Sequence, residues 1–197
     1  MSATSLTQPT MISILWPASG AQPWLRNVIL AIAGSLFVAL CAQVQVPMWP
    51  VPFTGQTFAV LVVGMAYGSR LGAATLALYM AEGAIGLPVF SNLSGGYTVL
   101  IGTTGGYILG FVFAAGLVGW LAERGWDRSV WQTGLAMVFG NLVIYALGLI
   151  WLGNVVGWDQ PVLQWGLYPF LIGDLLKIIL AAISLPWAWR MLSKKRS

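Results

Sequence analysis

The amino-acid sequence predicts an all-α integral membrane protein, built as one bundle of six transmembrane helices. Hydrophobic residues make up 58% of the chain and charged residues only 7%, whereas a soluble domain has roughly 25% charged residues. The mean hydropathy is +0.83. A spanning helix needs about 20 residues, so a chain of 197 residues accommodates six such helices with short loops and no second folded domain.

Apolar runs that are interrupted by charged residues, proline or glycine mark the predicted helices. The second and third runs are short, and Gly68 is expected to end one helix in a tight turn that leads to Arg70. A re-entrant pair is the alternative for these two runs, because fifteen helical residues reach only about 22 Å. The six runs are residues 28–46, 54–68, 71–87, 104–122, 131–152 and 169–192.

Residues 1–25 are expected to form an N-terminal tail, and residues 26–197 the single transmembrane domain. The tail contains no Lys or Arg, so it lacks the basic region that begins a secretory signal peptide. We therefore expect the tail to stay attached to the first helix.

All basic side chains except Lys177 fall on one side of this helix bundle, and the positive-inside rule assigns that side to the cytoplasm. The opposite connections, near residues 47–53, 88–103 and 153–168, contain no Lys or Arg. Both termini are therefore expected in the cytoplasm, and the polar outer loops are typical of a binding pocket. The basic residues concerned are Arg26, Arg70, Arg124, Arg128, Arg190, Lys194, Lys195 and Arg196.

Several classes of function are disfavoured by residues that the sequence lacks. It contains no histidine and a single cysteine, Cys41, so we expect no thiolate or histidine metal site and no Ser-His or Cys-His nucleophile. It contains no P-loop motif, so ATP is not expected to be hydrolysed by this chain. Its nine Lys and Arg residues are typical of a membrane surface and not of a nucleic-acid-binding protein. The sequence therefore predicts no enzyme and no cofactor.

Two charged residues of the last predicted helix, Asp174 and Lys177, lie inside the membrane. Their spacing of three residues places both on one face of the helix. A charge at the centre of a spanning helix costs about 3 kcal/mol on insertion scales, so polar groups are expected to face them. They form either a mutually satisfied pair that fixes packing, or a ligand clamp in which Asp174 accepts hydrogen bonds and Lys177 binds a carboxylate or carbonyl. Glu82 is a candidate partner for Lys177.

Further polar groups lie at the outer ends of two predicted helices. Thr54 is expected to be the N-cap of the second helix, and the Gln56 amide needs a partner because it enters the edge of the bilayer. Tyr107 carries a buried phenol that also needs a partner for its hydroxyl. The glycine pair at 105–106 before it indicates either close approach to a ligand or ordinary helix packing.

The first predicted helix carries Ala31, Ser35 and Ala39 at every fourth position. Such a stripe of small residues is typical of a close contact with another helix, within the chain or in a partner subunit.

Five motifs in order make the sequence resemble the BioY family, the biotin-binding S components of energy-coupling-factor (ECF) vitamin transporters. The resemblance extends from about residue 28 to residue 192. The motifs are Val-Pro-Phe-Thr-Gly-Gln-Thr at 51–57, Gly-Leu-Pro-Val-Phe at 86–90, Thr-Gly-Gly-Tyr at 104–107, Leu-Ala-Glu-Arg at 121–124 and Gly-Asp-Leu-Leu-Lys at 173–177.

This resemblance implies an ECF S-component-like bundle in the bacterial plasma (inner) membrane that captures biotin from outside. Its partners would be a transmembrane coupling protein and two ATPase subunits, which use the ATP. It also implies that the stripe Ala31, Ser35 and Ala39 meets the coupling protein. The residues expected to bind biotin are Asp174 and Lys177, the pocket residues Thr54, Gln56, Tyr107 and Asn92, and the apolar walls Phe53, Phe90 and Tyr79.

Two other classes of function stay open from the residues alone. A membrane scaffold would use Asp174 and Lys177 only as a pair and would bind no small ligand. A solitary proton- or ion-driven carrier would use Glu82 and Asp174 as its titrating groups. Only the resemblance selects biotin among the vitamins that combine N–H donors with an acidic group.

Overall fold

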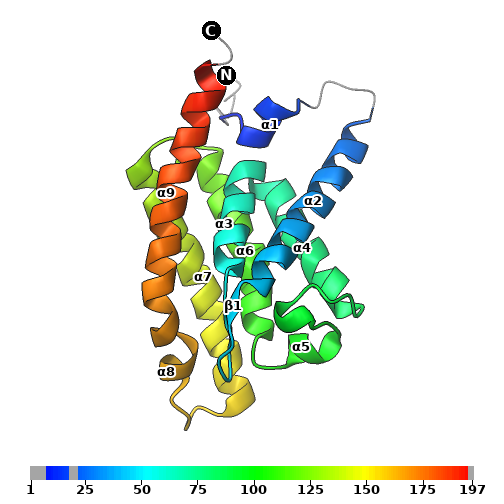
Figure 1. The fold of residues 1–197 in the computed structure, drawn as a ribbon, viewed down its shortest axis with the longest axis vertical. Coiled ribbons are helices and arrows are strands. Elements are labelled where there is room, and N and C mark those ends of the chain that lie inside the picture. Colours follow the sequence, from blue (N-terminus) through cyan, green and yellow to red (C-terminus); the bar gives the residue numbers. More distant parts are fainter. Residues whose placement is uncertain (1–7, 18–21, 195–197) are drawn as a thin grey trace, which may run out of the picture.

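A computed structural model describes residues 8–17 and 22–194 of the chain (Figure 1). The rest of the predicted tail, residues 1–7 and 18–21, and the terminal basic residues Lys195 and Arg196 lie outside the described residues. The long helices run side by side along the molecule, and the first and last described segments of the chain lie at the same end of the bundle.

Each predicted apolar run overlaps one of the longer helices. These are α2 (Pro23–Gln43), α3 (Gln56–Tyr67), α4 (Ser69–Ala84), α6 (Gly105–Ala122), α7 (Val130–Val156) and α9 (Leu171–Lys194). Short elements connect them: α1 (Met11–Leu15), β1 (Gln45–Val46), β2 (Phe53–Thr54), η1 (Ser91–Leu93), α5 (Tyr97–Ile101), α8 (Val162–Gly166) and η2 (Tyr168–Phe170). Strands β1 and β2 form an antiparallel pair in which Gln45 lies opposite Thr54.

By length and composition, 4 helical segments of the described chain are able to cross a membrane. They are α2, α6, α7 and the segment Val162–Leu192, which contains α8 and α9. The 12 residues of α3 and the 16 of α4 are shorter. The protein is therefore mostly helical and its apolar helices are those of a multi-pass membrane protein.

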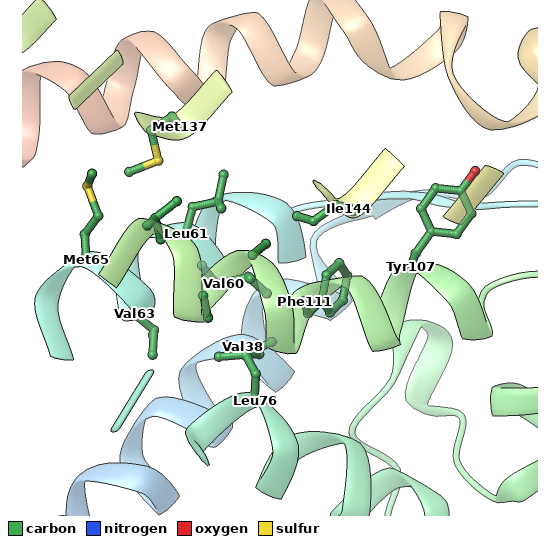
Figure 2. Close-up of a cluster of buried hydrophobic side chains, with 14 of the residues drawn as sticks. Val38, Val60, Leu61, Val63, Met65, Leu76, Tyr107, Phe111, Met137 and Ile144 are labelled. Atoms are coloured by element: carbon green, nitrogen blue, oxygen red, sulfur yellow. The ribbon is translucent and has the colours of Figure 1, made fainter. Parts of the chain in front are cut away.

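Helix α6 is the centre of the bundle, because it packs against α3, α4 and α7. Of the apolar segments long enough to cross a membrane, α6 has the largest buried share. Figure 2 shows the buried side chains that meet around α6. They come from α2 (Val38), α3 (Val60, Leu61, Val63, Met65), α4 (Leu76), α6 (Tyr107, Phe111) and α7 (Met137, Ile144).

The outward faces of α2 and α9 expose large apolar side chains. Leu40 is 70% exposed and Ile172 is 77% exposed. In water such faces would be unstable, whereas lipid tails solvate them. They are the faces expected to contact lipid.

The turn between α3 and α4 confirms the expectation that Gly68 ends a helix. Gly68 is the C-cap of α3 with a φ of 86°, a conformation that glycine adopts without strain. The carboxylate of Glu123 holds the turn, because its Oε1 accepts hydrogen bonds from the Ser69 N–H (2.7 Å) and hydroxyl (2.8 Å). Arg70 is exposed, as predicted.

The described part of the predicted tail, residues 8–17 and 22–25, includes a segment that lies across the end of the bundle at which α9 ends (Figure 1). Within residues 8–17 the chain forms α1, and α2 already begins at Pro23. Met11 of α1 is buried in the core. Arg26 holds the segment by donating hydrogen bonds to the carbonyls of Trp16 (2.6 Å) and Ile12 (3.0 Å).

Glycines allow α3 and α6 to pack closely. A Cβ added at Gly64 would lie 2.7 Å from the carbonyl oxygen of Ala115 and 2.7 Å from the Cγ2 atom of Val118. By contrast, a Cβ at Gly116, also on α6, would meet only the Cβ of Ala73, at an ordinary 3.6 Å.

We predict that Gly64→Ala lowers the thermal unfolding temperature in detergent by several degrees. The added methyl meets backbone, which cannot move aside, and such overpacking costs about 1–3 kcal/mol. Gly116→Ala is the matched control and should leave the unfolding temperature unchanged or raise it, because alanine favours helix. Equal stability of the two variants would contradict the close contact.

A buried carboxyl lies in the connection between α6 and α7. Asp127 is 1% exposed, and its Oδ2 accepts a hydrogen bond from the indole N–H of Trp189, while its Oδ1 has no partner among the described residues. Burial raises the pKa of Asp127, because desolvation disfavours the charged form more than Trp189 and Arg128 favour it.

A raised pKa in the folded state means that the folded protein binds the proton more tightly than the unfolded chain does. Stability from this group is therefore present at low pH and is lost as the pH rises through the folded pKa. We predict that Asp127→Asn raises the unfolding temperature near pH 7.5 and that this gain shrinks toward pH 4. Asp159→Asn, at an exposed aspartate, should show no such difference. A lower unfolding temperature for Asp127→Asn at pH 7.5 would rule out this account.

Candidate binding site

A pocket lies between α3, α6, α7 and α9, near the start of α9 and thus toward the end of the bundle opposite α1 (Figure 1). It has a volume of about 580 Å³, counting the space at its mouth. Its walls are mostly apolar, with one group of polar side chains. The lining residues are Val51, Pro52, Thr54, Gln56, Thr57, Phe90, Ser91, Val99, Thr104, Tyr107, Ile108, Phe111, Ile144, Tyr145, Phe170, Asp174 and Lys177.

Asp174 and Lys177 form an ion pair in the wall of this pocket, with Nζ and Oδ1 2.8 Å apart. Asp174 is only 4% exposed. The Lys177 ammonium also donates to the carbonyl of Thr54 (2.7 Å) and the hydroxyl of Thr57 (2.9 Å), so each of its N–H groups has an acceptor. The hydrogen bonds of the pair are thus satisfied within the protein, as a structural ion pair requires. The pair also lies beside a cavity, as a ligand clamp requires.

Two hydroxyl groups fix the Asp174 carboxylate from other helices. The Thr57 hydroxyl of α3 donates to Oδ1 (3.0 Å), and the Tyr145 hydroxyl of α7 donates to Oδ2. Neither residue was among those expected from the sequence to bind a ligand. The reasoning used for Tyr107 applies equally to Tyr145, which is a phenol within an apolar run, whereas no signal in the sequence separates Thr57 from its neighbours.

Thr54 and Gln56 begin a second series of hydrogen bonds, which passes through Tyr79 of α4 and ends at the Val89 carbonyl in the loop after it. Gly55, and not Thr54, is the N-cap of α3, but the Thr54 hydroxyl oxygen still accepts the Gln56 backbone N–H at 3.2 Å. The Gln56 amide finds a protein partner, because it donates to the Tyr79 hydroxyl (2.7 Å), which donates to the Val89 carbonyl (2.9 Å). Tyr79 therefore supports the pocket from behind, and it is not among the lining residues.

Tyr107 presents its ring to the pocket, and its hydroxyl has a partner in the protein. The hydroxyl donates to the carbonyl of Gly166 in α8 at 2.9 Å. At the glycine pair 105–106, a Cβ on Gly106 would lie 2.6 Å from the Leu147 carbonyl oxygen of α7. These glycines serve helix packing and not contact with the pocket.

The predicted aromatic walls differ in their positions. Phe90 lines the pocket and packs its ring edge-on against Tyr79, with centroids 5.4 Å apart. Phe53 is not a lining residue, but it lies behind the ion pair, with the Lys177 ammonium 4.2 Å from its ring centroid. Phe170, which was not predicted, lines the pocket and stacks on Phe53.

Asn92 does not line the pocket and is exposed. It lies next to Ser91, a lining residue, in a loop where Asn92 and Leu93 both have a positive φ. Gln43 at the end of α2 holds this loop, since its amide donates to the Phe90 carbonyl (3.0 Å) and accepts the Leu93 N–H (3.0 Å). In this conformation the Asn92 side chain therefore forms no part of the pocket wall.

The small-residue stripe of α2 faces the protein interior. Ser35 is completely buried and donates a hydrogen bond to the carboxylate of Glu82 in α4. Ala31 and Ala39 are half-buried. Glu82 thus pairs with Ser35 and not with Lys177, and Ser35 is closed to a partner subunit in this conformation.

No group of three or more His, Cys, Asp or Glu side chains able to hold a metal ion is found within the described part of the chain. The polar groups of the site are hydrogen-bond donors and acceptors around a single ion pair. Such an arrangement recognises a small molecule that carries both donor and acceptor groups.

Comparison with known proteins agrees with this description. The model of the BioY family matches residues 8–194. The biotin transporter BioY of Thermotoga maritima is 37% identical over 159 residues, which cover 81% of this chain and 93% of that protein. The probable biotin transporter BioY of Pyrococcus horikoshii is 39% identical over 152 residues, which cover 76% of this chain and 89% of that protein.

The fold matches that of a solved structure. It is the crystal structure of the S-component for biotin from an ECF-type ABC transporter, with a TM-score of 0.74 and 22% sequence identity. The match covers 88% of this chain and 95% of that chain. Since the family model spans nearly the whole described chain, this protein belongs to the BioY family.

Proposed function

We propose that this protein is the biotin-binding S component of an ECF-type transporter. The observation that carries the proposal is the Asp174–Lys177 pair in the wall of an otherwise largely apolar pocket. Relatives over most of the chain are named biotin transporters, and we propose transport and no catalysis for this chain.

The chemistry of the pocket suits the three parts of biotin. The ureido ring offers two N–H donors and one carbonyl acceptor, for which Asp174 and Lys177 are complementary. The carboxylate needs a cation, and Lys177 is the one cationic residue among those that line the pocket. The thiophane ring and the aliphatic tail need apolar walls, which Phe90, Phe111 and Ile144 provide.

The proposed topology has six membrane-spanning helices with both termini in the cytoplasm. It is supported by Arg26, Arg70, Arg124 and Arg128, which lie at or between helix ends on the side of the termini, and by the pocket near the opposite end. Helix α3 would reach only about 18 Å, so the bilayer would have to thin around the α3–α4 hairpin. The pocket would then open to the outside.

The proposed partners are a transmembrane coupling protein and two ATPase subunits. Contact of the coupling protein with Ala31 and Ala39 stays a prediction, since both are half-buried. Contact with Ser35 would require α2 to move away from α4 and break the bond between Ser35 and Glu82. No cofactor is proposed for this chain.

We predict that Asp174→Asn and Lys177→Ala each weaken the binding of labelled biotin by about 10- to 100-fold. A hydrogen bond to a charged group contributes roughly 1.5–3 kcal/mol, and each 1.4 kcal/mol is a factor of ten. The measurement is a binding isotherm of the purified protein in detergent, with membrane insertion checked in parallel. Asp159→Asn makes the same chemical change on an exposed loop and should bind biotin normally.

Unchanged binding in both variants, with intact insertion, would refute the clamp and favour a structural ion pair. In that case a double Asp174→Leu, Lys177→Leu variant should be at least as stable as the parent. Repeating the isotherms with biotinamide tests whether Lys177 contacts the carboxylate of biotin. If Lys177 contacts the carboxylate, Lys177→Ala should lower the affinity for biotinamide only slightly, because biotinamide has no carboxylate.

A separate prediction concerns the hydroxyls that fix Asp174. Tyr145→Phe and Thr57→Val should each weaken biotin binding by about 5- to 10-fold, because the carboxylate loses a donor that holds it in place. Tyr168→Phe, at an exposed tyrosine outside the pocket, is the control and should bind as the parent does. Parental affinity in both Tyr145→Phe and Thr57→Val would show that Asp174 needs no support from α3 and α7.

A further inference from the structure

A second hollow lies at the opposite end of the bundle from the biotin pocket. It is bounded by the N-terminal segment, the start of α2, the α3–α4 turn and Glu123, with about 1120 Å³ of space including its wide mouth. Two arginines, Arg26 and Arg70, contribute to its wall. It shares no lining residue with the biotin pocket.

The charged side chains in this hollow differ in the partners that they have. Arg26 donates to backbone carbonyls and to the Asn27 side chain, so its positive charge is not neutralised by an acid. Arg70 is exposed and makes no hydrogen bond or ion pair with any described residue. Glu123 is the acid in the wall, and its Oε1 is already bound to Ser69. The balance is one net positive charge, which is complementary to a single negative group.

An apolar groove adjoins this hollow through Arg26, which lines both. The groove has about 390 Å³ of space and includes Trp16, Leu25 and Ile29. Leu15 (58% exposed), which precedes Trp16, and Trp24 (63% exposed), which precedes Leu25, are further exposed apolar side chains next to these residues in the chain. A cationic hollow beside an apolar groove is complementary to a molecule with an anionic head and an aliphatic tail.

We infer that these two hollows bind one anionic phospholipid. Its phosphodiester lies between Arg26 and Arg70, and an acyl chain lies along Trp16 and Ile29. Basic pockets at the ends of transmembrane helices bind anionic headgroups in this way. The lipid would fasten the N-terminal segment to the start of α2, because residues of both contribute to each hollow.

The test is native mass spectrometry of the full chain in detergent, titrated with dioleoylphosphatidylglycerol, dioleoylphosphatidylcholine or inorganic phosphate. We expect phosphatidylglycerol to bind more tightly than phosphatidylcholine. Arg70→Gln should reduce this preference by about fivefold, because that is roughly the contribution of one basic residue to binding at an anionic surface. Arg124→Gln is the control, because Arg124 stacks on Trp120 outside the hollow and should retain the preference.

Any one of the following results would overturn the inference. They are equal affinity for the two lipids, an unchanged preference in Arg70→Gln, or a loss of preference in Arg124→Gln as large as that in Arg70→Gln. Full displacement of phosphatidylglycerol by inorganic phosphate would show a site for soluble anions in place of a lipid site.

Discussion

The ion pair between Asp174 and Lys177 is the interaction on which the candidate site depends. Two charges in an apolar bundle are tolerated only where hydrogen bonds compensate for the water that they lose. Here Thr57, Tyr145 and the Thr54 carbonyl provide that compensation from α3, α7 and the preceding strand. The pair therefore connects α9 to these three segments. It also gives the pocket wall a charged polar group.

Close packing around α6 makes this arrangement possible. Helices α3 and α7 hold the hydroxyls that meet Asp174, and both are positioned by their contacts with α6. Small residues at contacts such as Gly64 with Ala115 let the backbones approach, which is how helices associate in lipid where no hydrophobic force acts between them. The polar site is thus held by a packed apolar frame and not by loops alone.

The two ends of the bundle differ in chemistry. One end has the mostly uncharged pocket with its single ion pair, under a loop that Gln43 holds. The other end gathers arginines around the N-terminal segment and contains the buried Asp127. This division fits a protein that binds a small molecule at one end of the bundle. At the other end, its arginines would contact the lipid headgroups at the membrane surface.

Local sequence was enough to predict the helical membrane class, the approximate range of each long helix, the turn at Gly68 and the selection of Asp174 and Lys177 as candidate binding residues. These follow from hydropathy, glycine conformation and the cost of burying charge, which depend on local sequence. The packed structure was needed to show that Thr57 and Tyr145 contact Asp174, that Glu82 contacts Ser35, and that Asn92 does not line the pocket. Helical spacing tells which residues share a face, but not which face of a distant helix packs against them. That choice is made by the fit of side chains across the whole bundle.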